Sequence, residues 1–149
     1  MNKAKDGIAK SDKKAPAKIL MEKQGKTTKN PINNAANAEY EKSKSFIIVE
    51  IIEYVPNSVV IKTIIKKTTG NVTVSSFDTG EALTEKTSPF DTFVQVIDGK
   101  AEIFINGNSN SLNTGQSIII PAHARNVIKA NERFKIISTV IKSGYDEVS

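Results

Sequence analysis

The side chains best suited to metal binding and acid–base chemistry are scarce in this chain of 149 residues. It contains one histidine, His123, and no cysteine. The imidazole of histidine is the commonest metal ligand and general base at neutral pH. The thiolate of cysteine is another common ligand of zinc, copper and iron. The composition therefore argues against a transition-metal centre. The chain also contains no phosphate-binding loop, dinucleotide-binding fingerprint or serine–histidine–aspartate order.

Four carboxylates lie close together in the sequence, on Asp78, Glu81, Glu85 and Asp91. Aspartate and glutamate side chains are mostly exposed in folded proteins. We therefore interpret these four as a solvent-exposed rim rather than a catalytic pair. No residue is assigned a catalytic role, and no cofactor is expected.

Positive charge is concentrated at the start of the chain. Residues 1–30 hold nine lysines against three carboxylates, a net charge of +6, whereas the whole chain carries +5. Lysines at this spacing suit contacts with phosphate groups, and residues 1–30 lack the arginine and aromatic side chains that would stack on bases. We expect this segment to bind an anionic partner, such as RNA in a large ribonucleoprotein, or else to serve only as a solubilising extension. The lysines that would make these contacts are Lys3, Lys5, Lys10, Lys13, Lys14, Lys18, Lys23, Lys26 and Lys29.

The first 45 residues contain few large apolar side chains. Such a segment cannot bury enough surface to offset the entropy lost on ordering, so we predict a disordered tail and linker over residues 1–45. The folded domain is predicted over residues 46–149. Within the tail, residues 17–24 carry Ile19, Leu20 and Met21 after a proline and could form a short helix on a partner.

Membrane and secretion signals are not found in the sequence. The charged first residues are followed by no apolar stretch, and the longest apolar run, residues 46–49, is far too short to cross a bilayer. We expect a cytoplasmic protein that does not associate with membranes.

From residue 46 onward the sequence has an all-β texture. Runs of β-branched and aromatic residues alternate with Gly, Pro, Asn and Asp turn signals. Asp98-Gly99 predicts a two-residue hairpin, because both central residues of a type I′ turn need positive φ, and Asn106-Gly107 predicts a second reversal. Closed barrels and jelly rolls hide the edges of so many short strands, although the pattern alone also permits an immunoglobulin-like sandwich. The predicted strands are residues 46–55, 59–66, 72–77, 93–97, 101–105, 117–120, 127–129 and 134–142.

Two spaced motifs in this region resemble those of small single-domain cupins, a family of jelly-roll barrels. The first motif is a glycine followed by two histidines, a glutamate and a second glycine. This chain supplies Gly80, then Lys86 and Ser88 at the histidine positions, Thr92 at the glutamate position, and Gly99. The resemblance covers roughly the last hundred residues and implies a cupin-type barrel.

The second motif supplies the fourth metal ligand of the family, a histidine. It reads here as Gly115 and Pro121, then His123 at a glycine position, Asn126 at the histidine position and Ala130 at an asparagine position. The turn-forming residues thus keep their register while all four ligand positions have changed. The resemblance therefore implies a cupin scaffold without its metal.

The same interior could bind something other than a metal. Lys86, Ser88, Thr92 and Asn126 are the candidate pocket positions, with Phe90 and His123 as a possible rim. A small anion or a sugar is one candidate ligand, and simple filling of the space is the alternative. A metal-independent enzyme and a homodimer formed through the barrel also remain open.

Overall fold

The computed structural model describes residues 18–21 and 39–145, and nearly all regular structure in these residues is β. The only helical element among them is a 3₁₀ turn, η2 (Ile48–Glu50). The strands are β1 (Lys18–Met21), β2 (Ser58–Lys67), β3 (Gly70–Phe77), β4 (Ala82–Lys86), β5 (Asp91–Ile105), β6 (Asn108–Asn113), β7 (Ser117–Ile120), β8 (Asn126–Lys129) and β9 (Phe134–Ile141).

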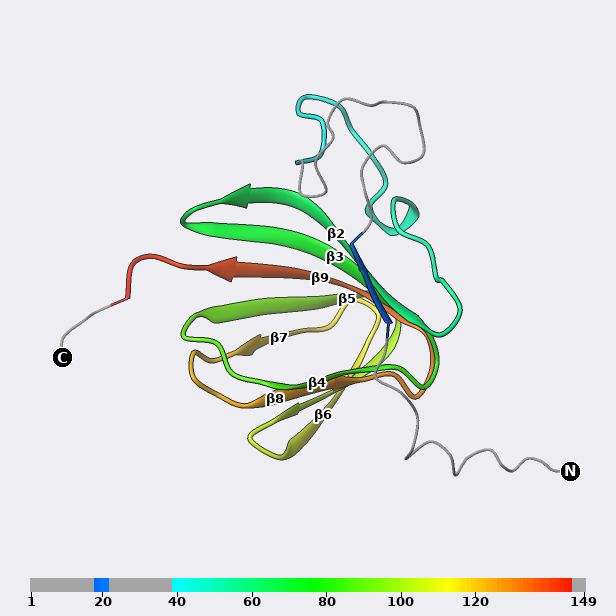
Figure 1. Ribbon diagram of the computed structural model, residues 1–149, viewed down its shortest axis with the longest axis vertical. Helices are drawn as coiled ribbons and strands as arrows, with labels where there is room; N and C mark the ends of the chain where they lie inside the picture. Colours follow the sequence, from blue (N-terminus) through cyan, green and yellow to red (C-terminus); the bar gives the residue numbers. More distant parts are fainter. Residues whose placement is uncertain (1–17, 22–38, 146–149) are drawn as a thin grey trace, which may run out of the picture.

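The strands form one curled sheet in which β1, β2, β3, β9, β5, β8 and β4 are successive neighbours, while β6 and β7 both pair with β5. Figure 1 shows β2, β3, β9 and β5 as an upper layer, with β8, β4 and β6 below. The 15-residue strand β5 belongs to both layers and joins them. The predicted all-β, jelly-roll type of fold is confirmed.

The bend in β5 corrects one predicted turn. Asp98-Gly99 does not form a hairpin: β5 continues through it, with a register shift against β9 between Val96 and Asp98. Gly99 has φ 88°, and a Cβ there would lie 2.3 Å from the carbonyl oxygen of Arg133. The positive φ expected of a turn is therefore present, but it serves the close approach of β9.

The second predicted reversal is confirmed. Asn106 and Gly107 have φ values of 50° and 86° and connect β5 to β6, with Ile105 opposite Asn108. Two residues of positive φ between paired strands form the tight hairpin that was expected.

The interior of the curled sheet holds the main hydrophobic core. Phe77 of β3 and Phe134 of β9 are fully buried, and their rings stack with centroids 4.5 Å apart. Val94 and Val96 of β5 are also buried in this core, so residues of this parity face inward.

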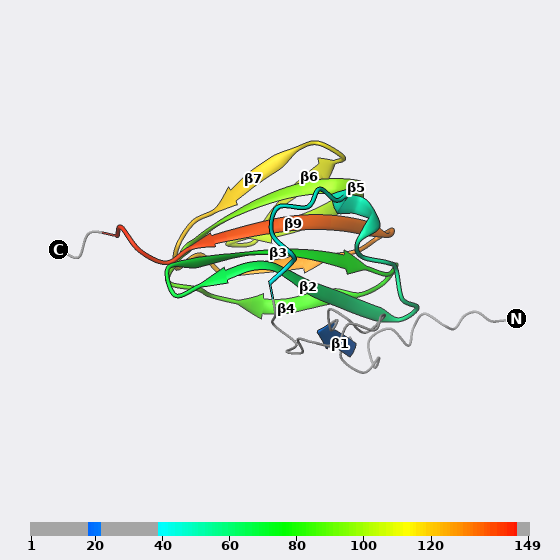
Figure 2. The same ribbon diagram turned by 90° about the horizontal axis from the view of Figure 1, so that it is seen from above.

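A second apolar cluster covers part of the outer face of the sheet, and it corrects the strand predicted over residues 46–55. That segment contains η2 and bends, and it pairs with no strand. It buries Ile52 against Val60, Ile64 and Val74, which point outward from β2 and β3. Figure 2 shows the segment crossing above β9 and β3. The run is apolar because it covers the sheet rather than because it joins it.

Besides β1, two strands of the barrel, β4 and β6, were not predicted. In β6 only Leu112 is buried, and the strand is otherwise polar, with the sequence NSNSLN. In β4 the ladder with β8 shifts register between Leu83 and Lys86. Neither segment has the alternation of apolar and polar residues on which strand prediction depends.

Part of the predicted tail contacts the barrel. Lys18–Met21 form β1, which pairs in parallel with β2, so in the chain alone these four residues are a strand; a helix on a partner stays a prediction. The amide of Tyr40 donates to the carbonyl of Ile64 at 2.9 Å, and the Tyr40 ring lies 4.6 Å from that of Phe46. The rest of the predicted disorder falls on residues 1–17 and 22–38, outside the described residues. In the described chain no helix is long and apolar enough to cross a membrane.

Candidate functional site

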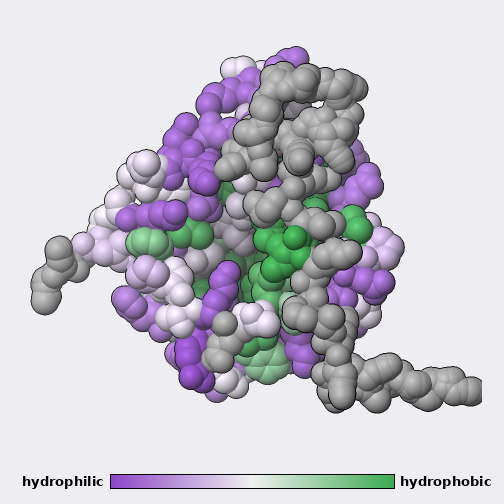
Figure 3. Space-filling view, viewed as in Figure 1, coloured by the Kyte–Doolittle hydropathy of each residue, from purple (hydrophilic) through white to green (hydrophobic). Residues whose placement is uncertain are grey.

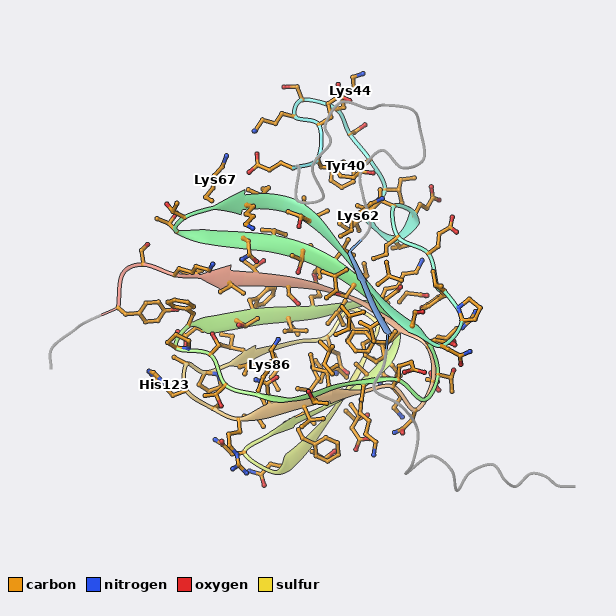
Figure 4. All side chains as sticks on the ribbon, viewed as in Figure 1. Tyr40, Lys44, Lys62, Lys67, Lys86 and His123 are labelled. Carbon is orange, nitrogen blue, oxygen red and sulfur yellow. The ribbon has the colours of Figure 1, made fainter. Side chains whose placement is uncertain are left out.

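The structure brings Lys86 and Asn126 together. Lys86 ends β4 and lies directly opposite Asn126, the first residue of β8. Asn126 is 9% exposed, and its side-chain amide donates to the backbone carbonyl of Lys86 at 3.4 Å. The Lys86 side chain is exposed, and Figure 4 shows it rising from β4 on the side of β7 and β5.

Ser88 and His123 meet through the backbone. The His123 amide donates to the Ser88 carbonyl at 2.6 Å, and the Ser88 hydroxyl accepts the Phe90 amide at 3.1 Å. His123 has φ 70° and an exposed side chain, so it lies in a turn between β7 and β8. The turn, and not an extended strand, therefore sets the direction of this imidazole.

Thr92 lies near the start of β5, and Phe90 comes just before that strand. Thr92 lies opposite Ile120 of β7 and Val140 of β9, and it is half-buried. The Phe90 ring packs 6.1 Å from Tyr145, next to the ammonium of Lys142. No hydrogen bond links the Thr92 side chain to the other three pocket positions within the described part of the chain.

The four positions do not form a donor set that fits a divalent metal. Lys86 presents an ammonium, Ser88 and Thr92 present neutral hydroxyls, and Asn126 presents a single amide oxygen. Across residues 18–21 and 39–145, no group of three or more histidine, cysteine, aspartate or glutamate side chains is arranged to hold a metal ion. Absence of a bound metal stays a prediction for elemental analysis.

The inner face of the sheet changes from apolar to polar along its length. Val59, Phe77 and Phe134 form an apolar row at one end, directly opposite one another across β2, β3 and β9. Four residues further along each strand, Thr63 lies opposite Thr73, and Thr73 lies opposite Ser138. We call these three residues the hydroxyl row.

The hydroxyl row faces the interior. Thr63 stands between Lys62 and Ile64, both of which point to the outer side, where Lys62 donates to the Ile51 carbonyl. Ser138 lies opposite Val94, a residue of the inner core. Ser75, beside the row on β3, has the same parity as Thr73.

Two hydroxyl groups on this inner face, those of Thr63 and Ser75, are buried. Thr63 is 5% exposed and Ser75 is 6% exposed. Among the described residues neither side-chain hydroxyl makes a hydrogen bond. Buried polar groups are normally paired with protein or water, so these two hydroxyls are candidate contacts for a polar molecule. The sequence alone did not indicate this group of hydroxyls, because Thr63, Ser75 and Ser138 are far apart in the chain and come together only in the folded sheet.

The acidic residues do not form a uniform exposed rim. Glu81 is only 2% exposed, because its turn closes onto the β8–β9 connection, where Gly80 donates to Ala130 and Ala130 donates back to Glu81. The Asn57 amide at 2.7 Å and the Arg133 guanidinium at 2.9 Å hold the pKa of Asp78 below its ordinary value.

A surface hollow of about 300 Å³ lies away from these residues, beside Glu102 on β5. The Glu102 carboxylate accepts hydrogen bonds from Ser109 and Asn131, both at 2.8 Å, and these bonds lower its pKa. This carboxylate is already paired with two side chains, which leaves it less free to bind a ligand.

The lysines predicted to contact an anionic partner fall almost entirely outside the described residues. Of the nine, only Lys18 belongs to a described element, where it begins β1 opposite Ser58.

Similarity to other proteins is found in the fold. No protein-family model and no curated protein matches the sequence. The chain resembles the conserved SPY1581 protein of unknown function from Streptococcus pyogenes, with 25% identity, a TM-score of 0.67, and coverage of 78% of this chain and 100% of that one. It also resembles a cupin 2 conserved barrel domain protein from Leptotrichia buccalis, with 28% identity and a TM-score of 0.64. That match covers 65% of this chain and 47% of the other, so this chain spans about half of that relative.

A further solved structure supports the same fold at lower identity. An RmlC-like cupin from Shewanella frigidimarina is 18% identical, with a TM-score of 0.59, and the match covers 72% of this chain and 97% of that one. The turn glycines, the inward parity of β5 and these structural matches agree, and the chain has the fold of a small, RmlC-like cupin domain.

Proposed function

We propose that this cupin domain is a non-catalytic binding module that takes a small, uncharged polar molecule, such as a sugar, on the hydroxyl-bearing half of its inner face. The observation that carries the proposal is the burial of the Thr63 and Ser75 hydroxyls without a partner in the described chain. Hydroxyl groups both donate and accept hydrogen bonds, and so match the hydroxyl groups of a sugar.

The lack of charged side chains in the hydroxyl row favours a neutral ligand. Thr63, Thr73 and Ser138 are uncharged, and Asn126 adds an amide at the β8 side. Lys86 is the one cation among the four pocket positions, and its side chain is exposed. A weak, reversible binding role needs no acid–base pair, which fits the donor set at these positions.

The test is a thermal-unfolding screen of the intact chain against neutral monosaccharides and polyols, with isothermal titration of any that raise the Tm. A ligand that binds the folded state raises the Tm as its concentration increases. Thr63→Val should remove the rise for that ligand. Thr139→Val, which makes the same replacement on the outer face, should leave the rise intact.

The unliganded Thr63→Val protein provides an internal check. Replacing an unpaired buried hydroxyl by a methyl group should leave stability unchanged or raise it by roughly 1 kcal/mol. If no sugar or polyol raises the Tm, or if Thr63→Val retains the full rise, the inner face is not the binding site.

A second proposed function concerns the basic segment. Residues 1–30 carry a net charge of +6, and Lys18–Met21 within them pair with β2. Figure 3 shows hydrophobic side chains gathered around β1 on this face, bordered by hydrophilic ones. We propose that the segment, attached at this edge, contacts an anionic partner such as RNA in a ribonucleoprotein. The salt-dependence experiment in the Discussion tests this.

A further inference from the structure

The outer edge of β2 is occupied by β1, a strand that precedes the barrel in the chain. β1 pairs in parallel with the start of β2, from Lys18 opposite Ser58 to Met21 opposite Ile61. In Figure 2 it lies beyond β2, on the side away from β3. An edge strand presents backbone groups that can pair with any added strand, and at this end of β2 the added strand is β1.

A second piece of the preceding chain covers the other end of this edge and is firmly held. The Tyr40 amide donates to the Ile64 carbonyl at 2.9 Å, and the Glu39 carboxylate accepts the Lys66 amide at 2.8 Å. The same carboxylate pairs with two lysine ammonium groups. Tyr40 also packs in the outer apolar cluster, so both side chains anchor this piece.

β1 has fewer anchors. Ile19 is 50% exposed and belongs to neither apolar cluster. The ladder is four residues long, and parallel ladders are slightly less stable per residue than antiparallel ones. Residues 22–38 separate β1 from Glu39, so β1 can leave the edge while the second piece stays. Pairing of this kind rests mainly on the backbone and therefore tolerates other sequences.

The edge offers apolar contacts on both of its faces. Val59 is fully buried in the inner core, and the next residue, Val60, is 1% exposed in the outer cluster. Directly opposite residues of paired strands lie on the same face, and Ile19 and Leu20 take the positions opposite these two valines. Consecutive aliphatic residues are typical of strands with apolar surroundings on both faces. The segment that fits this edge is thus an extended one with adjacent aliphatic residues.

We propose that the β2 edge is a docking site for an extended aliphatic segment of a partner protein, and that β1 is the internal strand that this segment replaces. The partner segment adds in parallel to residues 58–61. Backbone hydrogen bonds supply affinity and the adjacent aliphatic side chains supply specificity, as in other cases of strand addition. The proposal is independent of a ligand on the inner face.

The first test uses a fluorescent peptide of residues 14–25, KAPAKILMEKQG, and the intact chain. Ile19→Pro with Leu20→Pro removes two consecutive amide donors, one of which faces β2, and should detach β1. An internal strand competes at an effective concentration on the order of millimolar. Fluorescence anisotropy should therefore show the peptide binding this double-proline variant at least tenfold more tightly than the wild type. Ala35→Pro with Ala36→Pro, outside β1, is the matched control and should behave like the wild type.

Changes in the peptide define the chemistry of the site. A peptide with prolines at Ile19 and Leu20 should not bind the double-proline variant. Lysine at either of these positions should weaken binding by roughly tenfold or more, because it sets an ammonium against apolar surroundings. A scrambled peptide with the same lysines tests for attraction by charge alone. Equal binding of the scrambled peptide would contradict strand addition.

Hydrogen exchange locates the bound peptide. In the double-proline variant the edge-facing amides of residues 58–61 should exchange faster than in the wild type, and added peptide should restore their protection. The Lys66 amide, held by Glu39, should stay protected throughout. Unchanged exchange at residues 58–61 would mean that β1 does not protect this edge, and the proposal would fail.

Equal affinity of the peptide for the wild type and the double-proline variant, or no binding to either, would overturn the proposal. If the double-proline variant does not fold, Ile19→Cys offers a second test, because the chain contains no other cysteine. An environment-sensitive dye on this thiol should change its emission when millimolar peptide displaces β1, and should not respond to the proline peptide. A response to both peptides, or to neither, would also contradict the proposal.

Discussion

Asn126 lies directly opposite Lys86 in the β4–β8 ladder, and its side-chain amide donates to the Lys86 carbonyl at 3.4 Å. The cupin motif places metal ligands at both of these positions. Here one side chain is a cation and the other bonds to neighbouring backbone. The spacing that positions a metal site has therefore been kept while the chemistry at these positions has changed.

The opposite facing of two adjacent residues of β5 gives a sharp test of the fold. Val94→Asp should abolish cooperative folding, because it buries an unpaired charge in the inner core at a cost of several kcal/mol. Phe93→Asp, one residue away on the outer face, should fold with a similar Tm. Thermal unfolding at low protein concentration measures both. A stable Val94→Asp protein would contradict the assigned facing.

Two truncations separate the contribution of Tyr40 from that of the residues before it. Removing residues 1–44 deletes Tyr40, which packs in the outer apolar cluster and bonds to Ile64. This should lower the free energy of unfolding by about 1–3 kcal/mol. Removing only residues 1–38 deletes β1, which pairs with β2, but keeps Tyr40, so it should lower the free energy of unfolding less. Chemical denaturation compares the two, and equal stabilities would mean that Tyr40 contributes little.

Stability should fall at acid pH through Asp78. Its pKa in the folded state is lowered by the Asn57 amide and by Arg133. The stabilisation is therefore complete above the unfolded-state pKa and is lost as pH falls through the folded-state pKa, between roughly pH 5 and pH 2. Asp78→Asn should be less stable than the wild type at neutral pH and should show a smaller decrease over this range. Parallel curves for the two proteins would exclude Asp78 as the cause.

The basic segment should bind polyanions through charge alone. Each phosphate contact contributes a slope of about −0.7 to −0.9 in log K against log salt concentration, so several contacts predict a slope of a few units. Nuclease-sensitive co-sedimentation with ribonucleoprotein from lysate, over a salt series, measures this. Glutamine at Lys13, Lys14, Lys18, Lys23 and Lys26 should flatten the slope.

The control for this experiment changes the same number of charges on the barrel. Glutamine at the exposed residues Lys44, Lys66, Lys86, Lys100 and Lys129 should leave association intact. If the barrel variant loses association and the tail variant keeps it, the barrel surface is the contact. If the wild type does not sediment at physiological salt, the ribonucleoprotein proposal fails.

The sequence predicted those features that depend on local spacing. The turn glycines kept in the motif register predicted the cupin-type barrel, and the tight turn at Asn106-Gly107 follows from the need for positive φ. The same requirement led to the wrong prediction of a hairpin at Gly99. A glycine at a bend within a strand and a glycine in a hairpin turn give the same local signal in the sequence.

Features created by long-range pairing could not be predicted. An unbroken apolar run such as residues 46–55 does not distinguish a strand from a segment that covers one. The hydroxyl row forms only when β2, β3 and β9 align, and Ile141 and Gly70 become neighbours only through the β3–β9 register. Strand register is set by the whole sheet, and single residues carry no local signal for it.

The most direct measurement of the central claim, a cupin domain that binds without a metal, is elemental analysis of the purified chain. We predict no stoichiometric iron, zinc, manganese or nickel. Replacement of the four motif positions by the family ligands, as Lys86→His, Ser88→His, Thr92→Glu and Asn126→His together, should create a measurable site. One metal ion per wild-type chain, lost on Asn126→Ala, would contradict the account.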